Sequence, residues 1–357
     1  MTHTWHIRDY REGDEDQILS LRQEVFGDLD PVRLKPETWR WQFRDNPAGK
    51  PAWALAEDRD RIVGQYALIP TRFSVQGKET LFALSCDTMI HPDYRRQGLF
   101  TALARKVYQR IESEGRIAAV WGFPNESSIP GFTQHLDWRL LTVFPLRVAP
   151  LRPLTMLRRL LGLQKEAHNL PIEPNWGPVA PLRVDIPGLD MEPINRFGAE
   201  YDDLWNRHRA IAPVIQIRDA AYLNWRYRGI PGFGYRPFAI RSSGRLLGYM
   251  VIRTLSLMGH FFGVLTDIFP FPVRDPLTTQ HLFRYARNYC KDQGAEFMTC
   301  LLSRAEAAFF KRAGLKTVPP ILNPRKWRLG ARYAPSDASV LGVPENWYLT
   351  YGDTDIV

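Results

Sequence analysis

The stretch that decides the fold reads MIHPDYRRQGLFTAL over residues 89–103. It starts as an apolar strand, turns at Pro92, carries two arginines and a glycine, and continues as a one-sided helix. A helix N-terminus presents several unpaired N–H groups and a partial positive charge. If the residues before it curl so that their amides converge, as Gly98 allows, the loop becomes a cradle for a diphosphate. The alternative interpretation is a plain strand-to-helix turn with Arg95 and Arg96 on its surface.

The hydrophobic pattern predicts regular elements on both sides of this loop. Strands show alternating or continuous apolar residues, and helices repeat them every three to four positions. The predicted strands cover residues 6–10, 53–57, 62–70, 73–75, 81–90 and 117–123. The predicted helices cover residues 14–26, 101–113 and 129–136. This order indicates an α/β (α+β) fold with a mixed, mostly antiparallel sheet flanked by helices.

A later part of the chain repeats the order of the first part. The spacing from Trp41 to Asp87 is close to the spacing from Trp225 to Asp267, and in each case an apolar run ends at the aspartate and a helical pattern follows it. The repeat lacks the Arg-x-x-Gly loop, because residues 268–276 contain three prolines, which carry no amide hydrogen. We therefore expect two similar units, of which only the first holds the cradle.

Prolines suggest where these units begin and end. They are too frequent in residues 145–193 for a continuous core helix. We expect a first domain over residues 1–144, a proline-rich linker over 145–193, and a second domain over 194–357 that shapes the substrate cleft. Within the linker, residues 154–163 form a short basic amphipathic helix. Such a helix suits peripheral membrane contact or packing on its own domain.

The composition is typical of a globular protein from a reducing compartment. Hydrophobic residues make up 45% and charged residues 24%, which excludes a disordered chain. No apolar run reaches the about 18 residues that a membrane-spanning helix needs, and the first residues lack a secretory signal. Three cysteines without CxxC spacing argue against a disulfide framework and against a zinc site. We expect a cytoplasmic protein without a metal.

The chain carries an excess of positive charge. Lysine and arginine number 47 against 38 aspartates and glutamates, which gives a net charge of +9. This excess suits nucleic acid, an anionic membrane, a phosphate-bearing ligand, or no particular partner. The arginine-rich loop favours the phosphate-bearing ligand over nucleic acid. The sequence does not indicate an oligomeric state.

The loop resembles the central motif of the GNAT acyltransferase superfamily, which reads Gln or Arg, two residues, Gly, one residue, then Gly or Ala. Arg95 matches the first position and Gly98 the fourth, whereas Phe100 departs from the small sixth residue. The resemblance covers about residues 4–144 and, more faintly, residues 194–318. It implies a bacterial tandem GNAT-like protein with a degenerate C-terminal copy. The implied activity is N-acetyl transfer from acetyl-CoA, or from another acyl-CoA, without a metal.

The resemblance also assigns residues to the co-substrate. Main-chain amides that follow Arg95 would hold the diphosphate, and the end of the preceding strand would pair with the pantetheine arm. A backbone amide near Met89 or Ile90 would donate to the thioester oxygen. The implied co-substrate residues are Thr88, Met89, Ile90, Arg95, Arg96, Gln97, Gly98, Leu99, Phe100, Thr101 and Asn125.

Acyl transfer from a thioester to an amine needs a group that accepts the amine proton. The candidates are Asp87, Glu126, and Asn125 through an ordered water. Each has a plainer alternative: a structural carboxylate for Asp87, a solvated helix start for Glu126, and a helix cap for Asn125. The resemblance places Thr133 where relatives carry a tyrosine that protonates the leaving thiolate. His135 is the nearest titratable residue to that position.

We expect the acceptor to be a small-molecule primary amine, such as an amino sugar in polysaccharide synthesis. The aromatic and acidic residues 347–355 suit a sugar, or a final strand that docks on the second unit. Two other functions stay open. Phe100 and the missing tyrosine fit a catalytically silent acyl-CoA-binding regulatory module, and the positive charge fits aminoacyl transfer from tRNA to a cell-wall precursor.

Overall fold

The structure is a computed structural model that describes residues 4–27, 31–155, 182–183, 188–257, 260–319, 321, 323 and 326–354. The chain divides into two compact units. Unit 1 comprises Met1–Val143 and Trp327–Asn346, and unit 2 comprises Phe144–Lys326 and Trp347–Val357. In the described residues, no helix combines the length and the apolar character that crossing a membrane requires.

The sheet of unit 1 has the strand order β1-β2-β3-β4-β5-β16-β6. Its strands are β1 (His6–Arg8), β2 (Ala52–Asp58), β3 (Arg61–Val75), β4 (Lys78–Ile90), β5 (Ala119–Gly122), β16 (Trp327–Tyr333) and β6 (Arg139–Phe144). Neighbours from β1 to β4 are antiparallel, β4 and β5 are parallel, and β5 and β16 are antiparallel. This confirms the predicted mixed, mostly antiparallel sheet. The predicted strands 62–70 and 73–75 are one continuous strand.

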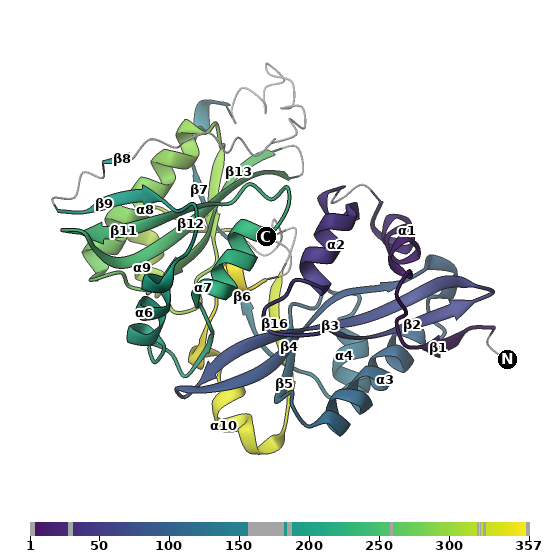
Figure 1. Ribbon diagram of the computed structural model, residues 1–357. Coiled ribbons are helices and arrows are strands. Elements are labelled where there is room, and N and C mark those ends of the chain that lie inside the picture. The colour runs from purple at the N-terminus through teal and green to yellow at the C-terminus, as the bar shows by residue number, and fades with distance from the viewer. Residues whose placement is uncertain are drawn as a thin grey trace. The chain divides into compact units, whose positions relative to one another are not determined.

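Helices cover both faces of this sheet. Those of unit 1 are α1 (Glu15–Phe26), α2 (Pro36–Phe43), α3 (Leu99–Glu114), α4 (Ile129–His135) and α10 (Ala338–Leu341). Figure 1 shows α1 and α2 on one face and α3 and α4 on the other. α3 ends at Gly115, whose left-handed backbone (φ 65°) turns its N–H back to the carbonyls of Ile111 and Glu112.

The core that positions α3 lies between this helix and the sheet. Leu103 and Val107 on α3 pack with Val63, Leu68 and Ala83 on the strands, and all five are at most 2% exposed. Burying a side chain of this size stabilises the fold by about 1.5–3 kcal/mol. The apolar stripe of α3 therefore fixes the start of the helix against the end of β4.

Unit 2 has a sheet of the order β15-β7-β14-β13-β12-β11-β9-β8. Its strands are β15 (Lys316–Thr317), β7 (Arg147–Pro150), β14 (Phe297–Cys300), β13 (His260–Phe269), β12 (Arg245–Leu257), β11 (Arg236–Ser242), β9 (Asp190–Pro193) and β8 (Leu182–Arg183). Its helices include α6 (Ala199–His208), α7 (Ala220–Leu223), α8 (Pro276–Asp292) and α9 (Ala307–Arg312). β10 (Val214–Gln216) pairs in parallel with β17 (Trp347–Tyr348).

The two sheets share one pairing scheme. In each, a run of antiparallel strands, β1 to β4 in unit 1 and β8 to β13 in unit 2, is followed by a parallel pair, β4 with β5 in unit 1 and β13 with β14 in unit 2. The next strand comes from elsewhere in the chain: β16 pairs with β5, and β7 pairs with both β14 and β15. The chain therefore exchanges one inner strand between its two sheets.

This exchange bears on the domain limits expected from the sequence. We expected consecutive domains over 1–144 and 194–357, but residues 327–346 belong to unit 1. The expected linker supplies β7 and β9 to the sheet of unit 2. The predicted amphipathic helix 154–163 lies outside the described residues from position 156 onward.

Candidate functional site

The loop between β4 and α3 forms a row of free backbone amides. Arg96 (φ 63°) and Gly98 (φ 77°) both have left-handed backbone conformations, and Gly98 is the N-cap of α3. The first hydrogen bond of the helix runs from the Ala102 amide to the Gly98 carbonyl. Within the described part of the chain, the amides of residues 96–101 donate to no protein group. Alternating backbone conformations of this kind turn successive N–H groups toward one anion.

The loop has open space where a ligand would approach. A Cβ added to Gly98 would meet no atom within 4 Å. Arg95 and Arg96 are both exposed, and Arg95 Nε donates to the Ile90 carbonyl at 3.3 Å. Gln97 steadies the loop, since its Nε2 donates to the Asp93 carbonyl at 3.1 Å. The conformation is thus held by contacts that leave its amides available.

The parallel pair β4 and β5 separates beside this loop. Their pairing ends at Leu84 opposite Trp121, although β4 continues to Ile90. Beyond Leu84, β4 pairs on one side only, with β3, in the sheet as described. The opposite edge is open from Ser85 onward, so an extended ligand can pair with it as an added strand. An ideal Cβ on Gly122 would lie 3.2 Å from the Ser85 carbonyl, so glycine keeps the point of separation clear.

The corresponding loop of unit 2 lacks these properties. Asp275 caps α8, and its carboxylate accepts from the Thr278 amide at 2.9 Å. A carboxylate at this helix start repels a phosphate and uses the amide that would bind one. Three prolines in residues 268–276 carry no amide hydrogen.

In unit 2, residues of the C-terminal segment lie beside the ends of the parallel strands β13 and β14. Leu302 bridges to Thr350, and the Ser303 amide donates to the Leu349 carbonyl at 3.0 Å. Thr350 Oγ1 donates to Asp267 on β13 at 3.0 Å. The last described residues therefore pack along the ends of β13 and β14, as the alternative of a docking strand predicted. The chain occupies this part of unit 2 itself.

A comparison of the sequence with protein-family models matches residues 6–141 to the acetyltransferase (GNAT) domain. The matched range contains the cradle and the open edge of β4. Unit 1 belongs to the GNAT superfamily. The resemblance seen in the loop is confirmed. No match is found among curated protein sequences.

Solved structures show that the tandem fold is shared along nearly the whole chain. A GCN5-related N-acetyltransferase from Anabaena variabilis has a TM-score of 0.61 at 12% identity, over 95% of this chain and 75% of that one. Saccharomyces cerevisiae N-myristoyltransferase with bound myristoyl-CoA has a TM-score of 0.60 at 12% identity, over 94% of this chain and 85% of that one. The glucosamine N-acetyltransferase region of a fungal β-N-acetylglucosaminidase has a TM-score of 0.57 at 15% identity, over 93% of this chain and 38% of that one. Identities this low establish the fold alone.

Within the GNAT domain, Asp87 lies at a bulge of β4 with a left-handed backbone (φ 46°). Its carboxylate is ion-paired with Arg22, and Arg33 Nη1 lies 3.9 Å away. Burial alone would raise the pKa of Asp87, but the charges of the two arginines outweigh it and the pKa lies below the usual value. A carboxylate held in this way is a weak proton acceptor. Its surroundings favour the structural alternative.

Asn125 and Glu126 lie together in the turn before α4. Asn125 Oδ1 accepts from the Ser127 hydroxyl at 2.7 Å and from the Ser128 amide at 3.0 Å, so it closes the turn as a cap. Glu126 pairs with Arg328 on β16 at 2.8 Å, and its side chain is 70% exposed. Among the described residues no contact joins either side chain to Asp87. The three predicted catalytic residues therefore do not form one cluster.

Sequence reasoning missed a set of buried hydroxyl groups beside the separation of β4 and β5. Ser85 Oγ donates to the Tyr66 hydroxyl at 3.1 Å, and the hydroxyls of Tyr66 and Tyr108 lie 2.7 Å apart. Trp138 Nε1 donates to the Tyr108 hydroxyl at 2.8 Å. A sequence signal existed, because Tyr108 interrupts an otherwise apolar helix face. Thr133, at the position of the tyrosine expected from the resemblance, donates to the Ile129 carbonyl in its own helix.

Proposed function

We propose that the protein is an N-acetyltransferase, or more broadly an N-acyltransferase, whose unit 1 transfers an acyl group from acetyl-CoA or another acyl-CoA to a primary amine. The observation that carries this proposal is the row of free amides at residues 96–101. The amides start a GNAT helix and face open space at Gly98. A diphosphate is the ligand group that such a helix start binds best.

The residues of unit 1 divide the work as follows. The amides of residues 96–101 hold the diphosphate, and Arg95 and Arg96 add positive charge beside it. The open edge of β4 pairs with the arm that carries the thioester. A backbone N–H near Met89 or Ile90 donates to the carbonyl oxygen as charge develops there. The amine attacks the carbonyl carbon directly, without an enzyme-bound acyl intermediate.

The acceptor that we propose is an amino sugar or another small amine. Support comes from a structural relative described as a glucosamine N-acetyltransferase region. A cytoplasmic location and peripheral membrane contact through residues 154–163 stay predictions, as does the exclusion of nucleic acid.

Calorimetric titration with CoA tests the co-substrate site. Gly98→Glu should abolish CoA binding, because it places a carboxylate at the start of α3. Gly115→Glu is the matched control, since Gly115 also has a left-handed backbone (φ 65°) and open space around an added Cβ. The control should bind CoA as the unsubstituted protein does.

Two results would refute the site. One is the absence of CoA binding by the unsubstituted protein, and the other is equal binding by both variants. Turnover is tested separately by thiol release from acetyl-CoA against a panel of amino sugars and small amines. Tight CoA binding without thiol release for any amine would favour the silent regulatory module.

A further inference from the structure

A line of hydrogen-bonded hydroxyl groups crosses the interior of unit 1. It runs from Ser85 on β4 through Tyr66 on β3 to Tyr108 on α3, with separations of 3.1 and 2.7 Å. Tyr66 is fully buried and Tyr108 is 4% exposed. A buried hydroxyl group needs one hydrogen-bond partner, which a single neighbour can supply. Here three hydroxyl groups form a continuous line between the edge of β4 and the surface beside α3, which suggests a further role.

One end of the line lies at the candidate active site. Ser85 is the first residue of β4 beyond the pairing with β5, and it is partly exposed. Gly122 on β5 packs close to it, since a Cβ added there would lie 3.2 Å from the Ser85 carbonyl. Ser85 therefore lies at the inner end of the open edge of β4, four residues along the strand from Met89, and the acyl end of an arm lying along this edge would point toward it.

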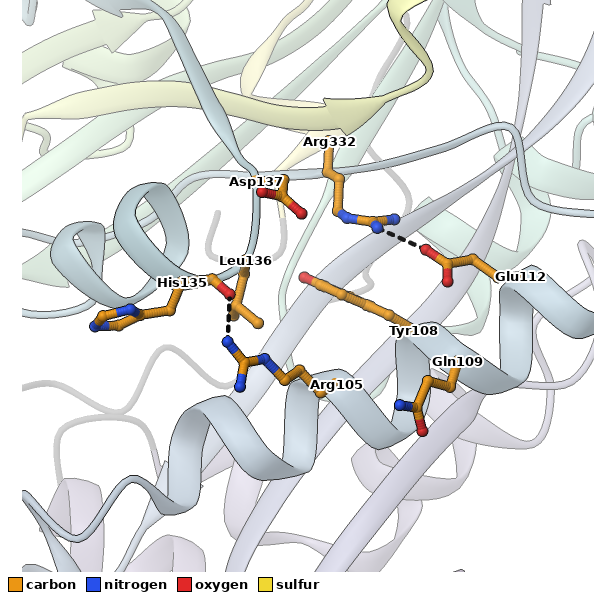
Figure 2. Close-up of a pocket in the computed structure, with 8 residues that line it drawn as sticks. All are labelled: Arg105, Tyr108, Gln109, Glu112, His135, Leu136, Asp137 and Arg332. Atoms are coloured by element: carbon orange, nitrogen blue, oxygen red, sulfur yellow. Dashed lines mark hydrogen bonds and ion pairs between the residues drawn. The ribbon is translucent and has the colours of Figure 1, made fainter.

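The other end lies at a surface hollow of about 120 Å³. Figure 2 shows Tyr108 reaching from α3 toward Asp137 and Arg332. The guanidinium of Arg332 stacks over the Tyr108 ring at 4.9 Å and pairs with Glu112 at 2.6 Å. The remaining lining residues are Arg105, Gln109, His135 and Leu136.

The directions of the hydrogen bonds point outward. Ser85 donates to Tyr66, so the Tyr66 hydrogen is free to go to Tyr108. Tyr108 already accepts from Trp138 Nε1. Its own hydrogen then has no acceptor among the described residues and is left for the hollow. Burial raises the pKa of Tyr66 well above its usual value and that of Tyr108 to about 12, so both keep their protons and can only pass them on.

We propose that Ser85, Tyr66 and Tyr108 form a relay that carries the amine proton from the reaction centre to solvent at the hollow. The proposal rests on the proposed function. Ser85 is the catalytic residue of the relay, and Tyr66 and Tyr108 act through it as positioning residues. The relay also explains how unit 1 can work although Asp87 is committed to Arg22.

The proton balance of the step is simple. The amine lone pair forms the bond to the carbonyl carbon, and the carbon–sulfur bond breaks with its electron pair on sulfur. The proton that nitrogen loses passes through water along the open edge of β4 to Ser85 Oγ. The Ser85 proton moves to Tyr66, and the Tyr66 proton moves to Tyr108. The Tyr108 proton passes to water or to the Asp137 carboxylate in the hollow. The thiolate leaves and takes a proton from solvent.

Single-turnover thiol release tests the relay, with protein in excess over acetyl-CoA and the fastest amine of the panel. Tyr66→Phe and Tyr108→Phe each remove one hydroxyl and keep the ring. Each should slow the step about tenfold or more, shift its pH profile and shrink the solvent deuterium isotope effect. Ser85→Ala should behave likewise, whereas Ser85→Thr should restore the rate. Affinity for acetyl-CoA should not change.

Tyr10→Phe is the matched control. It removes a hydroxyl of unit 1 that donates to Glu15 at 2.5 Å, outside the relay, and the rate should stay unchanged. The relay is overturned if the three hydroxyl-deleted variants bind acetyl-CoA and keep the rate and pH profile of the unsubstituted protein. If a tyrosine variant does not fold, the comparison of Ser85→Ala with Ser85→Thr decides. If the unsubstituted protein binds acetyl-CoA but releases no thiol with any amine, the proposed function fails and the relay with it.

Discussion

Arg22 and Asp87 form an ion pair that ties helix α1 to the bulge of strand β4. Their side chains are 9% and 11% exposed, and Arg33 adds a second positive charge 3.9 Å from the carboxylate. The bulge lies within the part of β4 whose edge is open. The pair therefore fixes the backbone along which the thioester would lie.

Replacing Asp87 by Asn should destabilise the protein by about 3–5 kcal/mol at pH 7, because it removes the negative charge that lies beside the buried side chains of Arg22 and Arg33. The pKa of Asp87 is lowered in the folded state. Its contribution is therefore complete above the ordinary aspartate pKa of about 4 and is lost as pH falls through the lowered value. Urea unfolding at pH 7 and pH 3 should show a difference between variant and parent that shrinks in acid.

The control for this change is Glu24→Gln, in the exposed pair between Glu24 and Arg61. Exposed pairs of this kind contribute at most about 1 kcal/mol, so the control should unfold close to the parent. An Asp87→Asn variant that is as stable as the parent at pH 7 would contradict the structural role of the pair.

The Phe100 ring occupies the space where Gly131 of α4 would carry a side chain. A Cβ at Gly131 would lie 2.5 Å from Phe100 Cε1. Gly131→Ala should therefore cost about 1–3 kcal/mol of stability, despite the better helix propensity of alanine. Adding Phe100→Leu should recover part of the loss in thermal unfolding. Strictly additive effects in this double-mutant cycle would contradict the contact. Gln134→Ala, exposed on the same helix, should change stability by at most about 0.5 kcal/mol.

Unit 2 is held by a buried pair between Arg218 and Asp353. Arg218 Nη2 donates to both carboxylate oxygens, at 2.9 and 2.7 Å, and the two side chains are at most 1% exposed. Asp353→Ala should cost about 3–5 kcal/mol of stability, since Arg218 would lose a partner in the interior. CoA binding below the unfolding temperature should persist if unit 1 alone holds the site. Asp292→Ala, exposed on α8, is the control and should leave the melting temperature nearly unchanged. An unaltered melting temperature for Asp353→Ala would contradict this account.

The exchanged strand predicts how fragments behave. Residues 1–144 alone lack β16 and leave one edge of β5 unpaired, so this fragment should fail to fold as a stable monomer. Joining residues 326–346 to it through a flexible linker should restore a cooperative thermal transition, measured by circular dichroism. A fragment 1–144 that melts cooperatively by itself would contradict the need for β16.

The local features of the site followed from the sequence because they depend on neighbouring residues. A glycine after two arginines, followed by an apolar helical stripe, predicted a cradle between β4 and α3. The structure has free amides there, with Gly98 as the N-cap. The proline-rich loop of the repeat likewise predicted a second unit without this cradle.

Features that depend on contacts distant in sequence could not be predicted in this way. Nothing near Asp87 in the sequence shows that Arg22 pairs with it, because residue spacing does not reveal which helix packs on the bulge. The strand exchange could not be predicted for the same reason, because the sequences of β16 and β7 do not show which sheet each strand joins. The hydroxyl relay depends on contacts between β4, β3 and α3. Of its three residues, only Tyr108 is visible in the sequence pattern, as a polar interruption of an apolar helix face.

The placement of β16 makes the timing of synthesis matter. A ribosome delivers the cradle of residues 95–101 early, yet the sheet beneath it stays incomplete until residue 333 has emerged. Domains usually fold as units in the order of their translation. In this chain the half translated first must wait for the half translated last, so a truncated nascent product would carry the binding loop without a finished scaffold to display it.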